Sequence, residues 1–189
     1  MLTSADALNG PYSDVLVNKE CLNMDYEGEF AVIIGQDCKN IQGNENPLEY
    51  VLGYTIGNDV SARYWQMPER SGNQYCYAKS FDGFAPLCPT ISSPSIVPNV
   101  SELSITTHVN GEQRQNASVS DLLFSVQDII RHLSRGTTLR AGTVIMTGTP
   151  GGVGTVMNPP RWLNDGDIVE VEVSGIGKIK NKHVWISDS

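Results

Sequence analysis

Short runs of apolar and β-branched residues alternate with polar turns along the whole chain. Eighteen glycines and ten prolines supply the turns, and this spacing is typical of a strand-rich fold. The pattern predicts six strands, at residues 29–34, 53–57, 103–109, 142–147, 167–173 and 177–186. Asn110-Gly111 predicts a hairpin of the Asn-Gly type, and Asp165-Gly166 predicts a second turn.

Helical periodicity is confined to two segments. In SDLLFSVQDIIRHLS, residues 120–134, the apolar positions fall on one helical face, and Ser120 can act as the N-cap. A shorter helix is expected at 46–52, with Pro47 in its first turn. The apolar face expected for the longer helix comprises Leu122, Leu123, Val126, Ile129, Ile130 and Leu133.

Composition narrows the classes of function. The 189 residues are enough for one domain with a core. A net charge of −8 argues against nucleic acid and against an anionic membrane surface. No apolar run is long enough to span a bilayer and no signal peptide opens the chain. The four cysteines are widely spaced, which favours reduced thiols in a cytoplasmic protein.

The histidines offer no pattern of their own. His132 falls on the polar side of the longer predicted helix, where a solvated side chain is expected. His108 and His183 have no ligand-like spacing to other residues, so structural or exposed positions are expected for both.

The stretch DYEGEFAVIIG, residues 25–35, places two glutamates at the mouth of a buried strand. Side chains two apart on a strand share a face, so Glu27 and Glu29 would lie side by side and repel each other. One interpretation is a solvated turn around Gly28, with the strand beginning at Phe30; another is pairing with a lysine. A third is a hard divalent cation, which carboxylates and substrate oxygens hold in common.

A third carboxylate follows in GYTIGNDVSARYWQ, residues 53–66. Asp59 ends an apolar strand, where it can point into a cleft or cap an ordinary turn. Arg63 and Gln66 are spaced to lie on the same side as Asp59. An acid, a guanidinium and an amide fit an acidic substrate beside a metal, but they also fit a surface turn.

Two further segments carry candidate chemistry. Lys79, in YAKSFDGFAP, lies among small and aromatic residues that can desolvate its ammonium, although an exposed lysine is the alternative. MTGTPGGVG, residues 146–154, is a glycine-rich turn whose backbone N–H groups can cradle an anion. It lacks the Gly-Lys-Ser/Thr ending of a phosphate-binding P-loop.

Taken together, DYEGEFAVIIG, GYTIGNDVSARYWQ, AKSFDGFAP, VNGEQRQ and TGTPGGVG follow the order and spacing of one family. From about residue 4 to residue 185 the chain resembles the catalytic C-terminal domain of the fumarylacetoacetate hydrolase superfamily. The resemblance implies an α+β fold, a β-rich mixed roll or barrel with a few helices, in one domain over residues 1–189. It also implies a homodimer.

The resemblance assigns roles to matching residues. Glu27, Glu29 and Asp59 match the family's metal ligands, normally for Mg²⁺, with Mn²⁺ or Ca²⁺ as alternatives. Arg63, Gln66, Lys79 and the Gly148-Thr149 loop match positions that line the substrate cleft, and Lys79 and Thr149 are the expected catalytic residues. A 2-oxo acid or β-dicarbonyl substrate would chelate the metal, which stabilises an enolate.

The family's hydrolases also carry a histidine upstream of the E-x-E motif, backed by a glutamate. Residues 1–24 contain no histidine, and Glu20 is their only glutamate, so the usual N-terminal part is expected to be absent. Metal-dependent hydrolysis of a C–C bond in an acylpyruvate-like compound is the leading expectation. The alternatives are decarboxylation or keto–enol isomerisation of a 2-oxo diacid, which needs no activated water, and a non-catalytic metal-binding subunit.

Overall fold

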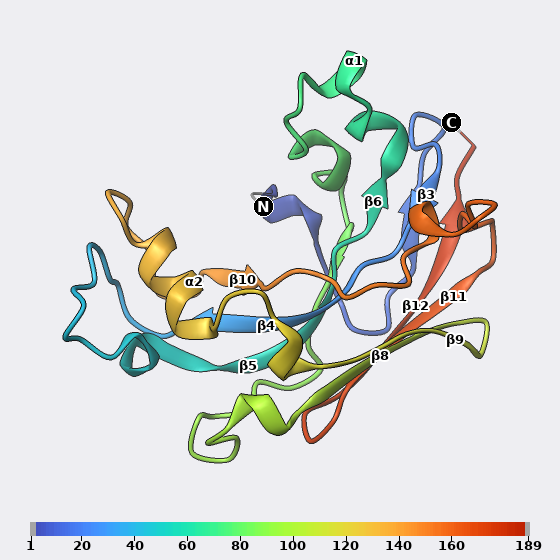
Figure 1. Ribbon diagram of the computed structural model, residues 1–189. Helices are drawn as coiled ribbons and strands as arrows, with labels where there is room; N and C mark the ends of the chain where they lie inside the picture. Colours follow the sequence, from blue (N-terminus) through green and yellow to red (C-terminus); the bar gives the residue numbers. More distant parts are fainter. Residues whose placement is uncertain (1–2, 188–189) are drawn as a thin grey trace.

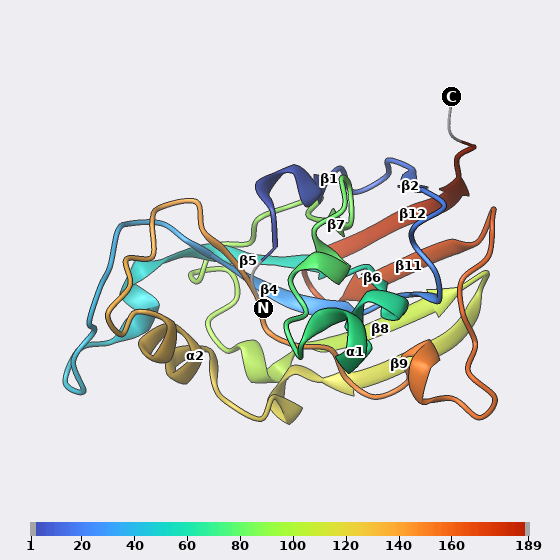
Figure 2. The ribbon, with the colours of Figure 1, turned by 90° about the horizontal axis from the view of Figure 1, so that it is seen from above.

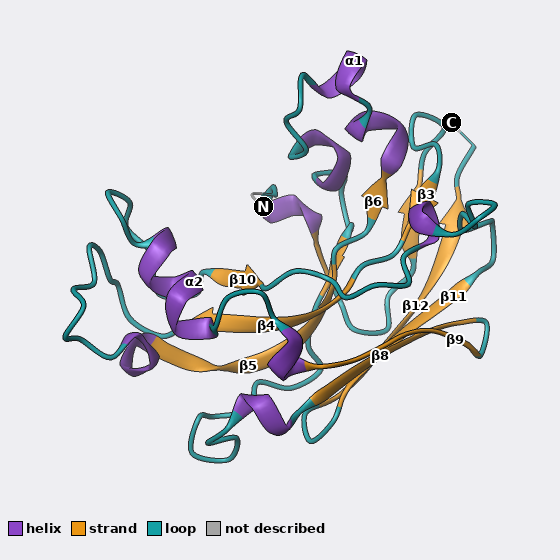
Figure 3. Cartoon of the chain, in the orientation of Figure 1, coloured by secondary structure: helices purple, strands orange, loops and turns teal. Residues whose placement is uncertain are grey.

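The computed structural model describes residues 3–187, and strands and loops make up most of it (Figure 3). Two sheets form its centre: a three-stranded sheet in the order β10-β4-β5, and a five-stranded sheet in the order β2-β12-β11-β8-β9. Two short pairs, β1 with β7 and β3 with β6, lie outside these sheets. The strands are β1 (Leu8–Asn9), β2 (Val15–Val17), β3 (Met24–Asp25), β4 (Gly28–Ile34), β5 (Val51–Asn58), β6 (Ser61–Ala62), β7 (Ala85–Pro86), β8 (Ser104–Val109), β9 (Glu112–Ser118), β10 (Val144–Met146), β11 (Ile168–Val173) and β12 (Gly177–Trp185).

The helices are short. There are two α-helices in the described part, α1 (Pro68–Ser71) and α2 (Val126–Leu133). The 3-10 turns are η1 (Ala5–Ala7), η2 (Pro47–Tyr50), η3 (Arg63–Gln66), η4 (Tyr77–Lys79), η5 (Val100–Glu102), η6 (Val119–Asp121) and η7 (Gly154–Val156). In Figure 1, α2 lies against the three-stranded sheet, and α1 lies beyond β6. Seen from above, α2 occupies the opposite end of the molecule from the end of β12 (Figure 2).

Strand β4 is the centre of the three-stranded sheet. All seven of its residues are buried, as expected for a strand covered on both faces. It pairs antiparallel with β5 on one side and with β10 on the other. The six predicted strands are all present, with the segment predicted at 142–147 shortened to β10.

The five-stranded sheet follows the alternation of its sequence. Buried and more exposed positions alternate along β8 and β11, which is the pattern of a sheet with one covered face. Strands β8 and β9 form the predicted hairpin. Asn110 and Gly111 both have positive φ, at 52° and 82°, as the central residues of a type I′ turn require.

Gly28 is a point of close approach between the two sheets. A Cβ atom at this position would lie 2.2 Å from the Thr107 hydroxyl oxygen and 3.0 Å from a Val171 methyl group. Both of those residues belong to the five-stranded sheet. The residue between the two glutamates is therefore part of a strand and has no side chain because another sheet occupies that space.

The helix predicted at 120–134 is wrong in its first half. Ser118 caps η6 through a capping box, and Ser125 caps α2 by accepting the Asp128 N–H, so the segment forms a single 3-10 turn, a non-helical stretch at 122–125, and then α2. Two serine caps seven residues apart divide the segment, because each side chain satisfies the N–H groups of a new helix start. Leu123 is consequently 94% exposed instead of lying on the buried face with Val126 and Ile130.

The shorter helix predicted at 46–52 is also reduced, to η2, because Val51 already belongs to β5. The four cysteines are free thiols. Across residues 3–187, no helix has the length and apolar character needed to cross a membrane. The architecture is α+β and β-rich, as predicted.

Candidate metal-dependent active site

Three carboxylates meet where β4 begins and β5 ends. Antiparallel pairing sets Gly28 opposite Asn58, and the Asp59 N–H donates to the Glu27 carbonyl at 2.9 Å. Glu27 immediately precedes β4, Glu29 is its second residue, and Asp59 immediately follows β5. One carboxylate oxygen from each of the three lies within 4.8 Å of the other two. The strand register therefore brings together residues that are about thirty positions apart in sequence.

The cluster is buried, so the interpretation of a solvated turn is wrong. Glu27, Glu29 and Asp59 are 9%, 3% and 6% exposed. Burying carboxylates is costly unless they are paired or coordinate a metal. Their surroundings must therefore supply positive charge.

Lys79 and Arg63 supply part of that charge. The Lys79 ammonium, 2% exposed, contacts Glu27 Oε2 at 2.6 Å and also pairs with Asp59. Arg63 contacts the other oxygen of Glu27 at 2.6 Å and donates to the Gln66 amide oxygen at 2.9 Å. The sequence interpretation of Lys79 as an exposed residue is wrong, and the pairing of a glutamate with a lysine is present together with the acidic cluster.

Asp25 is a fourth buried carboxylate beside this group. It accepts the N–H groups of Gly154 and Thr155 at 2.8 and 3.0 Å and pairs with Arg63 at 2.9 Å. Arg63 is thus held between Asp25 and Glu27. The same carboxylate fixes the end of the glycine-rich segment that begins at Met146.

The charges of this buried group do not balance. Within residues 3–187, Asp25, Glu27 and Asp59 form ion pairs with Lys79 and Arg63, while Glu29 lies beside them without one. These four carboxylates exceed the two cations by two negative charges when all six groups are ionised. Burial, reinforced by the charges of Asp59 and Glu27, raises the pKa of Glu29 to about 8. Burial also raises the pKa of Asp59, against the lowering effect of the Lys79 ammonium. The site has the donor set and the missing charge of one hard divalent cation.

The glycine-rich loop lies against the cluster. The Gly148 N–H donates to Glu29 at 2.6 Å, and the Thr149 hydroxyl donates to the Gly28 carbonyl at 3.0 Å. The predicted anion-binding loop therefore already uses its Gly148 N–H to bind one of the protein's own carboxyl groups, that of Glu29. Gly148 has a φ of 101°, which explains a glycine at this position.

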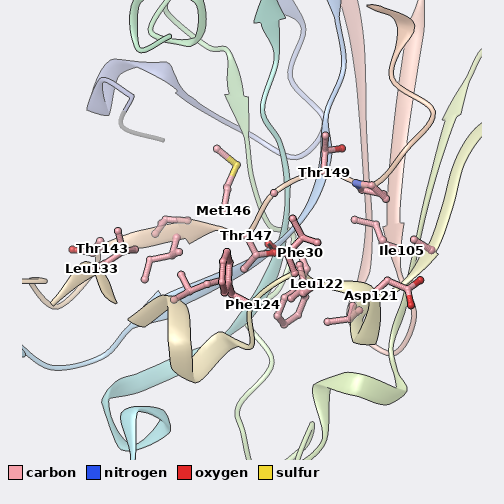
Figure 4. A pocket seen from close by; sticks show the side chains of 18 of the residues that line it. Phe30, Ile105, Asp121, Leu122, Phe124, Leu133, Thr143, Met146, Thr147 and Thr149 are labelled. Carbon is pink, nitrogen blue, oxygen red and sulfur yellow. Dashed lines mark hydrogen bonds between the residues drawn. The ribbon is translucent and has the colours of Figure 1, made fainter. Parts of the chain in front are cut away.

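An apolar cavity of about 790 Å³ opens on the other side of the same loop. Thr147, Gly148, Thr149 and Pro150 line one wall of it, and Phe30, Leu122 and Phe124 contribute to the rest. Figure 4 shows these three apolar side chains gathered near the loop that carries Thr147 and Thr149. The loop thus separates a charged region from an apolar one.

A family model described as fumarylacetoacetate (FAA) hydrolase C-terminal matches residues 1–184. The chain belongs to this family. The resemblance deduced from the motifs is confirmed over almost the whole chain.

Several relatives of this chain are named as oxaloacetate tautomerases. The Xenopus laevis protein "Oxaloacetate tautomerase fahd2, mitochondrial" is 37% identical over 177 residues, which are 94% of this chain and 55% of the relative. The Homo sapiens "Oxaloacetate tautomerase FAHD2A, mitochondrial" is 39% identical over 180 residues, 95% of this chain and 57% of the relative. The chain therefore spans little more than half the length of these relatives, and its description as one complete catalytic domain stays a prediction, as does its cytoplasmic location.

Solved structures of family members have the same fold. Fumarylacetoacetate hydrolase from Exiguobacterium antarcticum superposes with a TM-score of 0.91 at 39% identity, covering 97% of this chain and 65% of that one. A 2-hydroxyhepta-2,4-diene-1,7-dioate isomerase from Mycobacterium marinum gives a TM-score of 0.87 at 34% identity, covering 100% and 69%. The fold deduced for a fumarylacetoacetate hydrolase domain is confirmed.

Three further residues of the site lie within the motifs of the fumarylacetoacetate hydrolase family, although no role was predicted for them. Asp25 opens DYEGEF, Asn58 precedes Asp59 and accepts the Glu27 N–H at 3.0 Å, and Gln115 ends VNGEQRQ. All three are polar residues that are almost fully buried. Their place inside the matching motifs was the only feature of the sequence that pointed to them. Their hydrogen bonds between strands cannot be predicted without knowing which residues the strand pairing sets opposite each other.

The three histidines lie on elements other than β4 and β5, which carry the cluster. His108 lies in β8, and His132 is exposed on α2, as predicted. His183 is buried in β12 opposite Val15, and burial lowers its pKa to about 4. We assign no part in the candidate site to these three residues.

Proposed function

We propose that this chain catalyses the keto–enol tautomerisation of a small 2-oxo diacid such as oxaloacetate, with Mg²⁺ as cofactor. The observation that carries the proposal is the buried group of Glu27, Glu29 and Asp59 in direct contact with Lys79. The names of the tautomerase and isomerase relatives favour this reaction over the hydrolysis that the sequence made the leading expectation.

Glu27, Glu29 and Asp59 would hold the cation. Their carboxylate oxygens are ligands suited to Mg²⁺, and Mn²⁺ or Ca²⁺ would accept the same set. When bound, the metal supplies Lewis-acid polarisation of the substrate's 2-oxo group. The pKa of Glu29 is raised to about 8, so this carboxyl group holds a proton at neutral pH. That proton supplies positive charge which a bound cation would otherwise supply.

The chain's own residues would bind the substrate and manage its charge. The Lys79 ammonium is held by two carboxylates, so it is positioned to stabilise the negative charge that develops on an enolate oxygen. Arg63, fixed between Asp25 and Glu27, and Gln66 beside it are suited to a substrate carboxylate. The burial of Lys79 excludes water from its ammonium and strengthens its electrostatic effect.

Tautomerisation moves a proton between C3 and the oxygen on C2 and needs no water molecule. Hydrolysis of a C–C bond needs a base that activates water, a contribution of about 10²–10⁴-fold, and no histidine lies on an element that carries the cluster. We therefore expect acylpyruvate cleavage by this chain to be slow compared with enolisation. The alternatives of decarboxylation and of a non-catalytic metal-binding subunit remain hypotheses that the same assay separates.

The test follows the enol absorbance of oxaloacetate after dilution of the pure enol into buffer, with Mg²⁺ alone and with Mg²⁺ plus protein. We expect the protein to accelerate conversion over Mg²⁺ alone, and Asp59→Asn to remove that acceleration. Asp37→Asn is the matched control, because Asp37 pairs with Arg140 on the surface. Release of CO₂ without faster enol decay would favour decarboxylation.

Binding of Mg²⁺, measured by calorimetry, with no acceleration of either reaction would contradict the proposal and favour the non-catalytic subunit. Acylpyruvate cleavage on the order of 10 s⁻¹, an ordinary enzyme rate, would restore hydrolysis as the main function.

A further inference from the structure

Gln115 connects the two sheets beside the candidate site. It lies in β9 opposite Thr107 of β8 and is 1% exposed. Its side chain points from the five-stranded sheet to Gly28, the residue between the two glutamates, and to the loop at Thr149. A fully buried amide must satisfy its hydrogen bonds within the protein.

Three hydrogen bonds fix the orientation of this amide. Its oxygen accepts the Gly28 backbone N–H at 3.1 Å. Its nitrogen donates to the Thr149 hydroxyl oxygen at 2.8 Å and to the Pro150 carbonyl at 2.9 Å. A backbone N–H only donates and a carbonyl only accepts, so rotating the amide by 180° would break two of the three bonds.

The orientation of Gln115 also determines what the Thr149 hydroxyl does. A hydroxyl has one proton. Because Gln115 donates to the Thr149 oxygen, the Thr149 proton is directed to the Gly28 carbonyl, 3.0 Å away. Gln115 and Thr149 together therefore satisfy both backbone groups of Gly28, and they tie the loop to the start of β4.

We propose that Gln115 is a positioning residue for the reaction: it acts through Thr149 and sets where the 147–150 loop stands relative to Glu27 and Glu29. This inference rests on the proposed function, in which the loop lines the substrate cleft. The loop in turn donates its Gly148 N–H to Glu29 and its Thr149 hydroxyl to the carbonyl of Gly28, so its placement affects both Glu29 and the residue between the two glutamates. Gln115 itself need not touch the substrate.

The first test replaces Gln115 by methionine, which keeps most of the side-chain length and volume and removes all three hydrogen bonds. We expect kcat/KM for tautomerisation to fall about 10–100-fold, as is typical when an outer partner of a metal site is lost. Gln113→Met is the matched control, since Gln113 is the same residue type at an exposed position of the same strand. It should leave kcat/KM unchanged.

A double-mutant cycle separates positioning from general stabilisation. If Gln115 acts through Thr149, Gln115→Met should lower kcat/KM far less in a Thr149→Val background than in the wild type, because coupled residues are not additive. Full additivity of the two substitutions, measured on variants with intact thermal transitions, would overturn the proposal. If Gln115→Met does not fold, Gln115→Glu replaces it in the cycle. This variant accepts the Gly28 N–H but, when ionised, cannot donate to Thr149 or Pro150.

Hydrogen exchange gives a readout that does not depend on activity. Faster exchange in Gln115→Met at the Gly28 and Gly148 amides, with unchanged exchange in α2, is expected. Unchanged exchange at both amides would overturn the inference, whether or not the wild type is a tautomerase. A wild-type protein that does not accelerate tautomerisation but shows the exchange difference would refute only the proposed function and leave Gln115 as the residue that places the loop.

Discussion

The two sides of the 147–150 loop differ in almost every physical respect. On one side, four buried carboxylates and two cations are joined by short ion pairs and backbone hydrogen bonds. On the other side, the cavity is lined mainly by apolar side chains, and Leu123 and Phe124 are 94% and 67% exposed. Charged groups need fixed geometry to offset their burial, whereas apolar surface is stabilised by whatever covers it. The charged side is thus suited to chemistry, and the apolar side to association.

The largest effect that would sharpen this contrast is expected for Lys79→Met. Removing one partner from a buried ion pair costs about 3–5 kcal/mol, because the remaining charges lose their compensation. We expect a large fall in the thermal midpoint of the metal-free protein, partly reversed by Mg²⁺, and a fall in kcat of about 10²–10³-fold, as for the loss of one charge-stabilising donor.

Lys180→Met is the control for that experiment, because Lys180 pairs with Glu170 at the surface, where about 0–1 kcal/mol is at stake. Equal thermal midpoints for Lys79→Met and Lys180→Met would mean that the Lys79 ammonium does not compensate the charge of the buried carboxylates.

The next effect concerns pH. The folded-state pKa of Glu29 is raised to about 8 from 4.5, so the folded metal-free protein binds one more proton than the unfolded chain between these values. Its free energy of unfolding should therefore fall as pH rises from about 4.5 to 8, by at most about 1.4 kcal/mol per pH unit from this group. Glu29→Gln should remove that part of the slope, as denaturant titrations at several pH values would measure.

Glu172→Gln serves as the comparison for this series, since Glu172 lies exposed on β11. Identical slopes in wild type and Glu29→Gln would contradict the burial of a like-charged carboxylate cluster. With saturating Mg²⁺ the wild-type slope should weaken, because a bound cation favours the ionised form.

The smallest effect on the fold is expected on the apolar side. Phe124→Asp changes a largely exposed side chain, so the free energy of unfolding should change by no more than about 0.5 kcal/mol. The homodimer implied by the family resemblance is still a proposal; if this face forms its interface, the substitution should lower the sedimentation mass from dimer to monomer.

Tyr12→Asp tests the same change at a side chain of nearly equal exposure, 66%, located before β2. An unaltered mass for Phe124→Asp, or the same loss of mass for both variants, would remove the reason to regard the apolar side as an interface.

The contrast also explains what the sequence could and could not predict. The positions of the strands could be predicted from short apolar and β-branched runs. The grouping of Glu27, Glu29 and Asp59 could be predicted from the order of the family's motifs. The division of residues 120–134 could not be read from periodicity, because two serine caps compete with an apolar pattern that fits one helix. The role of Gln115 was equally hidden, since it depends on the register that sets Gln115 opposite Thr107 and against Gly28.

The close approach at Gly28 has a consequence for how this sequence can change. A methyl group there would collide with the Thr107 hydroxyl oxygen, an atom that is buried and has no hydrogen-bond partner in the described part of the chain. Alanine at position 28 would therefore require a smaller residue at position 107, and neither replacement can be judged alone. Position 28, between the two glutamates, and position 107 in the other sheet are therefore expected to change together. A substitution in one sheet decides which substitutions the other can accept.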